Sequence, residues 1–210
     1  MVDMTLVHGL WQRGWSMAVM AGRLRARGHD VRVFSYPTRS DSLDGHADRL
    51  YQFITREGVG RLDLVGHSMG GLVILNMLNR YTDLPPGRVV LMGTPVIGSS
   101  AARRLVKLPG RKFLFGKAGE DLLRGFPNTP ARHETGMIRG TRPLGIGRIS
   151  GRFNEPSDGT VAVRETQLDG LADSIELHLT HTQMLVSTEV VDQVEHFISN
   201  GRFLHTHTKV

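Results

Sequence analysis

The sequence contains no cysteine. This absence excludes disulfide bonds, thiolate nucleophiles and thiolate metal sites, and it leaves serine, threonine, carboxylates and histidine to carry any chemistry. No apolar run approaches the roughly 18 residues that a membrane-spanning helix needs. The N-terminus also lacks a basic segment followed by an apolar run and a small-residue cleavage site, which a signal peptide would have. We therefore expect a cytoplasmic protein.

The length and composition favour one globular domain over residues 1–210. Of the residues, 40% are hydrophobic and 22% are charged, which is ordinary for a folded domain. The net charge of +6 points weakly toward anionic partners. Residues 99–117 carry six lysines and arginines and no acid, so this segment is a candidate contact with an anionic membrane surface. We favour the alternative of a solvated surface, and no motif indicates nucleic-acid binding.

Short β-rich runs alternate with helix-like segments along the chain, a pattern that indicates a parallel sheet covered by helices. The spacing predicts strands at 4–7, 31–34, 62–65, 89–92, 146–149 and 175–179, and helices at 16–27, 43–56, 69–79 and 188–199. Residues 99–145 are basic, irregular and rich in glycine and proline. A connection of that length is usually functional or flexible.

The strongest motif is Gly66-His67-Ser68-Met69-Gly70, a G-x-S-x-G pattern between a predicted strand and a predicted helix. The two glycines are needed because Ser68 must occupy a tight turn that projects its hydroxyl, and side chains at 66 and 70 would collide with nearby backbone. The start of the following helix favours developing negative charge. Ser68 is therefore the candidate nucleophile.

Residues 64–71, LVGHSMGG, resemble the nucleophile elbow of α/β-hydrolases, particularly of lipases and esterases. Residues 6–10, LVHGL, resemble the strand end and oxyanion loop of small bacterial lipases. Residues 92–99 resemble the GTPxxGS segment of lipases and GPI-deacylase-like hydrolases, although many relatives have histidine in place of Val96. The resemblance implies a three-layer α/β-hydrolase fold, with a minimal, mostly parallel sheet of about six strands that lacks the family's first two.

The resemblance also bears on residues 99–145, which match the family least. They fall where relatives carry a lid or an acyl-binding insertion, so we interpret them as a candidate element of that kind. The family's order of nucleophile, then acid, then histidine requires a carboxylate and a later histidine after Ser68.

Two histidines near the last predicted strand are candidates for the general base. His178 alternates with apolar neighbours inside that strand, whereas His181 lies on the loop beyond it, where a base can reach across the sheet edge. We favour His181. His8 and His67 lie within the motifs and are interpreted as hydrogen-bonded structural histidines.

The candidate acid is Asp158, in the sequence Ser157-Asp158-Gly159-Thr160-Val161. It resembles the acid loop of the family, and the glycine permits a turn that aims the carboxylate at an imidazole. The alternative is an aspartate that stabilises its own turn. The other acids considered are Asp169, Asp173 and Glu155.

The oxyanion hole should use one backbone N–H from the residue after the nucleophile and one from the loop after the first strand. These residues are Met69 and, by resemblance, Leu10. Trp11, on the same loop, either lines the acyl pocket or packs on the sheet, and we weigh these two equally. No metal site or cofactor is expected.

These observations together predict a serine hydrolase that cleaves small-molecule or lipid carboxylic esters through a Ser68–His181–Asp158 triad and an acyl-enzyme. Thioesterases, amidases and acyltransferases use the same triad, so they remain alternatives within the superfamily. A non-catalytic binding protein that keeps the elbow as scaffold is the alternative from another class.

Overall fold

The computed structural model describes residues 3–56, 60–105, 117, 129–130, 132–145 and 155–205. Six strands form one sheet in the order β2-β1-β3-β4-β5-β6, and each neighbouring pair is parallel. The strands are Asp3–Val7 (β1), Asp30–Phe34 (β2), Asp63–His67 (β3), Gly87–Met92 (β4), His133–Gly140 (β5) and Asp173–Leu177 (β6). The expected six-stranded parallel sheet is confirmed.

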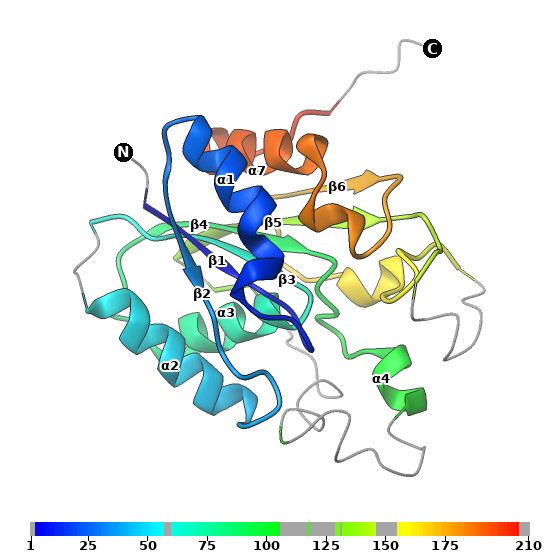
Figure 1. Cartoon of the computed structure of the whole chain (residues 1–210), viewed down its shortest axis with the longest axis horizontal. Helices are drawn as coiled ribbons and strands as arrows, with labels where there is room; N and C mark the ends of the chain where they lie inside the picture. Colours follow the sequence, from blue (N-terminus) through cyan, green and yellow to red (C-terminus); the bar gives the residue numbers. More distant parts are fainter. Residues whose placement is uncertain are drawn as a thin grey trace.

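Helices cover both faces of the sheet (Figure 1). They are Ala18–Ala26 (α1), Leu43–Thr55 (α2), Met69–Arg80 (α3), Ser100–Leu105 (α4) and Thr188–Asn200 (α7), with short 3-10 turns at Gly14–Met17 (η1), Val163–Thr166 (η4) and Gln183–Leu185 (η5). Helices α1 and α7 lie on one face, and α2 and α3 lie on the other. No helix in the described segments is both long enough and apolar enough to span a membrane.

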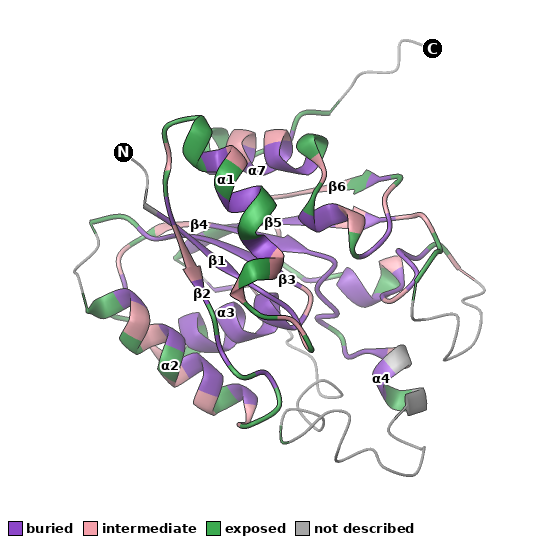
Figure 2. Ribbon diagram, in the orientation of Figure 1, coloured by how far each residue is buried: buried purple, intermediate pink, exposed green. Residues whose placement is uncertain are grey.

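The inner strands β1, β3 and β4 are largely buried on both faces, which explains why they are mostly apolar in the sequence. The outer strands β2 and β6 are partly exposed. Neighbouring residues point to opposite faces. Leu6 and Val65 belong to the core under α1 and α7, whereas Val7 and Leu64 belong to the core under α2 and α3. Figure 2 shows the central strands buried between the two helical layers.

The sequence prediction differs from the structure most clearly between α4 and η4. The fifth strand is β5, inside the segment 99–145 that was expected to be irregular. Its sequence, HETGMIRG, mixes charged residues and glycine with two buried apolar residues, Met137 and Ile138, so it carries little strand signal. The strand expected at 146–149 lies outside the described residues. So do residues 106–116 and 118–128, and the lid and membrane-contact hypotheses therefore stay predictions.

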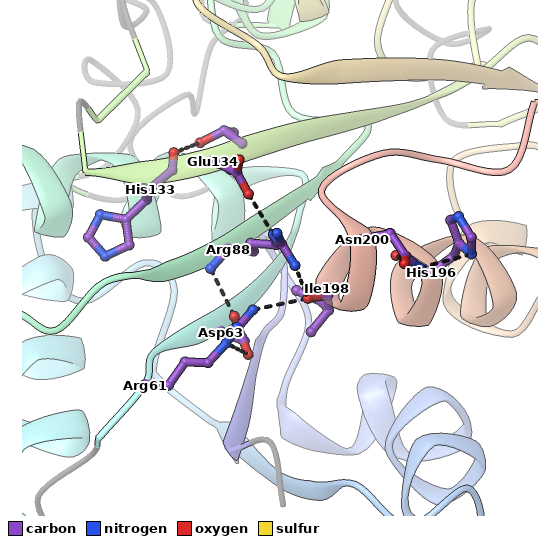
Figure 3. A network of polar contacts seen from close by, with 9 residues as sticks. Arg61, Asp63, Arg88, His133, Glu134, His196, Ile198 and Asn200 are labelled. Carbon is purple, nitrogen blue, oxygen red and sulfur yellow. Dashed lines mark hydrogen bonds and ion pairs between the residues drawn. The ribbon is translucent and has the colours of Figure 1, made fainter.

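A polar network locks helix α7 to the amino ends of the central strands (Figure 3). Asp63 is fully buried, and its carboxylate accepts the Arg88 backbone N–H and the Arg61 Nε–H, both at 2.8 Å. Both guanidinium groups also donate to the carbonyl of Ile198, at 3.0 and 2.8 Å. Because carbonyls at a helix C-terminus carry partial negative charge, two cations there stabilise the end of α7. Arg88 pairs outward with Glu134 at 2.6 Å.

We expect Asp63→Ala to lower the free energy of unfolding by about 2 to 3 kcal/mol, because hydrogen bonds to a buried charged group are lost and a backbone donor is left without an acceptor. The matched control is Glu134→Ala in the same network. The Glu134 side chain is 58% exposed, so its removal should cost less than about 1 kcal/mol. Urea denaturation of both variants checks this, and equal losses would contradict it.

Candidate active site

Ser68 occupies the turn between β3 and α3 in a strained conformation, with φ 54° and ψ −123°. A positive φ is unfavourable for a residue with a side chain, and a conformation of this kind costs about 1 to 3 kcal/mol. Among the non-glycine residues described, only Ser68 and Trp11 have a positive φ. Ser68 is partly exposed, whereas His67 and Met69 on either side are buried. Of these three residues, the turn thus exposes only Ser68, at the carboxyl end of β3.

The two motif glycines sit where no side chain fits. A Cβ on Gly66 would lie 2.6 Å from the backbone of Gly71, and a Cβ on Gly70 would lie 2.3 Å from the carbonyl oxygen of Val7. The Ser68 N–H donates to the carbonyl of Met92 at the end of β4, at 2.9 Å. Contacts with β1, β4 and α3 therefore hold the elbow from three sides.

The structure brings Asp158 and His181 together. His181 Nδ1 lies 2.6 Å from Asp158 Oδ2, and both side chains are buried. The other carboxylate oxygen accepts the backbone N–H groups of Thr160 and Val161, at 2.9 and 2.7 Å. The His181 N–H also donates to the Asp158 carbonyl at 2.9 Å. Main-chain and side-chain contacts thus orient the pair.

Gly93 links this pair to the elbow. It follows β4 with a φ of +54°, and a Cβ there would lie 2.9 Å from Asp158 Oδ2 and 3.0 Å from His181 Nδ1. The preceding residue, Met92, accepts the Ser68 N–H. The backbone of Met92 and Gly93 therefore lies against both the turn at Ser68 and the Asp158–His181 pair.

A second contact comes from His67, the residue before Ser68. Its Nε2 lies 2.9 Å from the carbonyl oxygen of His181, and the two rings pack with centroids 4.5 Å apart. His181 thus lies beside the elbow.

The loop after β1 is braced by the segment that follows β2. The Tyr36 hydroxyl donates to the His8 carbonyl at 2.9 Å, and the Tyr36 N–H donates to His8 Nε2 at 3.3 Å. The Trp11 N–H donates to Thr38 Oγ1 at 3.2 Å. These bonds hold the loop in place although Trp11 has an unfavourable φ of 61°.

Within this loop, the backbone donors next to Leu10 are already engaged. The Gly9 N–H donates to Gln12 Oε1 at 3.0 Å and the Trp11 N–H to Thr38, contacts that do not involve the Leu10 N–H. A Cβ on Gly9 would lie 3.0 Å from the Ser68 Cβ, so the loop runs directly beside the elbow.

The second predicted oxyanion donor belongs to Met69. It is the first residue of α3, and backbone N–H groups in the first turn have no intrahelical acceptor. Trp11 is 45% exposed, and its role in substrate binding stays a prediction.

Comparison with known proteins identifies the family. A sequence model of the alpha/beta hydrolase family matches residues 6–189. The chain belongs to this family. A carbendazim hydrolyzing esterase from Nocardioides sp. (strain SG-4G) is 33% identical over 92 residues, which are 38% of this chain and 37% of the esterase. The probable esterase PIR7A from Oryza sativa is 33% identical over 95 residues, 40% of this chain and 36% of the relative. The matches thus span little more than a third of these relatives.

A solved structure supports the fold over a larger share of the chain. The mature form of lipase BlEst2 from Bacillus licheniformis superposes with a TM-score of 0.67 and 20% identity, covering 88% of this chain and 86% of the lipase. At this identity the likeness establishes a common fold. The resemblance to α/β-hydrolases seen in the sequence is thereby confirmed.

The other acids and the second histidine considered from the sequence make no described contact with the side chains of the Asp158–His181 pair. His178 is exposed just beyond β6, and Asp173 is the first residue of β6, at the amino end of the strand. Glu155 pairs with Arg164 at 2.7 Å, and Asp169 is exposed. None of these has a described contact with His181 or Ser68.

Sequence reasoning missed several residues that support the candidate site. Glu165 is fully buried, and its carboxylate accepts the N–H groups of Ser100 and Ala162, at 2.6 and 3.1 Å. It therefore ties the acid loop to the start of α4. No local pattern distinguishes it from an exposed loop acid. Tyr36 and Thr38, by contrast, follow the carboxyl end of β2, where site residues gather in parallel sheets.

Two histidines of the site are buried in a way that disfavours their charged forms. Burial lowers the pKa of His8, partly offset by a hydrogen bond to the Gly9 carbonyl and reinforced by His46. Burial and the neighbouring His181 hold the pKa of His67 well below its ordinary value. Because the unfolded chain protonates both near pH 6.5, it binds more protons than the folded chain below that pH. Stability should therefore fall as the pH drops through about 6.5.

We expect each of these histidines to contribute a slope of up to about 1.4 kcal/mol per pH unit below about pH 6.5. His67→Gln should make the pH dependence of the unfolding free energy correspondingly shallower. Urea denaturation at about pH 7.5, 6.5 and 5.5 measures this. His178→Gln, at an exposed position, is the control and should keep the wild-type slope. Identical slopes in all three proteins would refute the expectation.

Proposed function

We propose that this hydrolase cleaves carboxylic esters with Ser68 as nucleophile, His181 as general base and Asp158 as the acid that orients the base. The observation that carries the proposal is the buried 2.6 Å contact between His181 Nδ1 and Asp158 Oδ2 beside a strained, partly exposed serine. A buried histidine in contact with a buried aspartate beside a serine is the arrangement that activates a serine nucleophile. The esterase and lipase names of the relatives agree with it.

The contact with Asp158 sets the tautomer of the base. A carboxylate accepts the Nδ1–H of His181, which leaves Nε2 unprotonated and able to take the Ser68 proton. The serine oxygen then attacks the ester carbonyl and forms a tetrahedral intermediate. The protonated His181 gives its proton to the leaving alcohol, and a water molecule activated by the same imidazole releases the acyl group.

The oxyanion is stabilised in this scheme by the backbone N–H groups of Leu10 and Met69. The hydrogen bonds of the loop after β1 are compatible with this assignment, because the described donors on either side of Leu10 bond to Gln12 and Thr38. The start of α3 contributes the positive end of a helix dipole at the same point. The scheme calls for no metal and no organic cofactor. We propose small-molecule or lipid esters as the substrate class.

Ser68→Ala should abolish covalent labelling by a fluorophosphonate probe and lower the hydrolysis of short p-nitrophenyl esters by about 10⁴- to 10⁶-fold, because no nucleophile remains. Labelling followed by intact-protein mass spectrometry measures the first effect. Ser40→Ala, at an exposed serine, is the control and should label like the wild type. A wild-type protein that stays unlabelled while a control esterase reacts would overturn the mechanism.

Asp158→Asn should lower kcat by about 10³- to 10⁴-fold, because the amide would donate to Nδ1 and force the proton onto Nε2. The side chain keeps its shape, so the thermal unfolding midpoint reports separately on folding. Asp169→Asn, at an exposed acid of the neighbouring loop, provides the control and should retain full activity. Retention of more than about a tenth of kcat in a folded Asp158→Asn would contradict the assigned role.

A further inference from the structure

We propose that His67 is a positioning residue for the general base: its Nε2–H holds the main chain of His181 while its ring supports the imidazole from behind. The inference rests on the proposed function, because it assigns His67 a role in the action of His181. This role goes beyond the proposed triad, because the sequence alone indicates only a hydrogen-bonded structural histidine at position 67.

Three hydrogen bonds fix His181, and they come from two directions. Asp158 accepts two of them: its Oδ2 accepts the His181 Nδ1–H at 2.6 Å, and its carbonyl accepts the His181 backbone N–H at 2.9 Å. His67 supplies the third, at 2.9 Å to the His181 carbonyl. Because His67 immediately precedes Ser68, this bond ties the base to the elbow that carries the nucleophile. The separation of nucleophile and base therefore depends on it.

The contact also assigns the tautomer of His67. A carbonyl oxygen only accepts, so Nε2 carries the hydrogen and Nδ1 is unprotonated. Nδ1 is buried and has no hydrogen-bond partner among the described residues. It lies 3.3 Å from the place where a Cβ on Gly9 would be. A proton on Nδ1 would therefore point at packed backbone without an acceptor.

The surroundings of the ring keep it neutral. The titratable groups that act on it are His181 and His8, both bases, and together with burial they hold the pKa of His67 well below the ordinary value. Asp158 contacts His181 directly and is not among the groups that shift the pKa of His67. Neutrality matters because His181 becomes a cation during acyl transfer, and a second cation with its ring 4.5 Å away would oppose proton transfer.

Two substitutions separate the two contributions. His67→Phe keeps an aromatic ring against His181 but removes the donor, whereas His67→Gln keeps a neutral N–H donor and removes the ring. We expect His67→Phe to lower kcat by about 10- to 100-fold while KM changes by less than about twofold, since the base is displaced and substrate contacts are not. The kcat of His67→Gln should be at least about tenfold higher than the kcat of His67→Phe.

A spectroscopic readout distinguishes positioning from a loss of stability. The proton shared by His181 Nδ1 and Asp158 should give a far-downfield resonance in the wild type. We expect this resonance to persist in His67→Gln and to shift or broaden in His67→Phe. A His67→Phe protein with wild-type kcat, or a His67→Gln protein no better than His67→Phe, would overturn the proposal.

The wild-type protein tests the inference even if a variant fails to fold. Ring-nitrogen chemical shifts should report the neutral, Nε2-protonated tautomer of His67 from about pH 5.5 to 8. A His67 ring that titrates in this range, or that carries its proton on Nδ1, would refute the assignment. Failure of the wild type to hydrolyse any ester would instead refute the proposed function, so the two failures are distinguishable.

Discussion

The close approach of backbone at the turn after β3 is the constraint on which the rest of the structure depends. Gly70 has room for no side chain because its Cα faces the Val7 carbonyl of the neighbouring strand β1. That contact brings the start of α3 against the loop after β1, and Ser68 takes a positive φ between them. The strained serine, the loop after β1 and the helix start are therefore close together for a single steric reason.

The carboxyl ends and the amino ends of the strands have different roles. At the carboxyl ends of the strands, bare backbone at Gly9 and Gly93 lets the elbow, the acid and the histidine approach one another. At the amino ends, buried Asp63 and two arginines fasten α7 to the sheet. The strained turn at Ser68 is thus supported by a sheet that is covered by helices on both faces. At the amino ends of the strands, away from the site, α7 is fastened to this sheet.

The parts of the structure that could be predicted from the sequence are the segments that carry a local signal of their own. Strands β1 to β4 and helices α2, α3 and α7 are continuous apolar runs or carry apolar residues at helical spacing, and Ser42 and Ser187 cap two of the helices. Strand β5 lacks such a run and was missed. The sequence indicates Asp158 by its resemblance to the family's acid loop and His181 by its place on the loop beyond the last strand, but their 2.6 Å contact is a tertiary fact. The bracing by Glu165 has no local signature, because it acts on Ser100, which is distant in sequence. For Thr38 the only signal is its place after β2.

The most direct test of the proposed mechanism is a crystal structure of the protein after reaction with a phosphonate inhibitor. The account predicts phosphorus bonded to Ser68 Oγ, with the phosphoryl oxygen within about 3.1 Å of the Leu10 and Met69 nitrogens. His181 Nε2 should lie within about 3.2 Å of an oxygen on the adduct. A His181 ring that stays beyond hydrogen-bond reach of the adduct, with Asp158 still bound to it, would contradict the account.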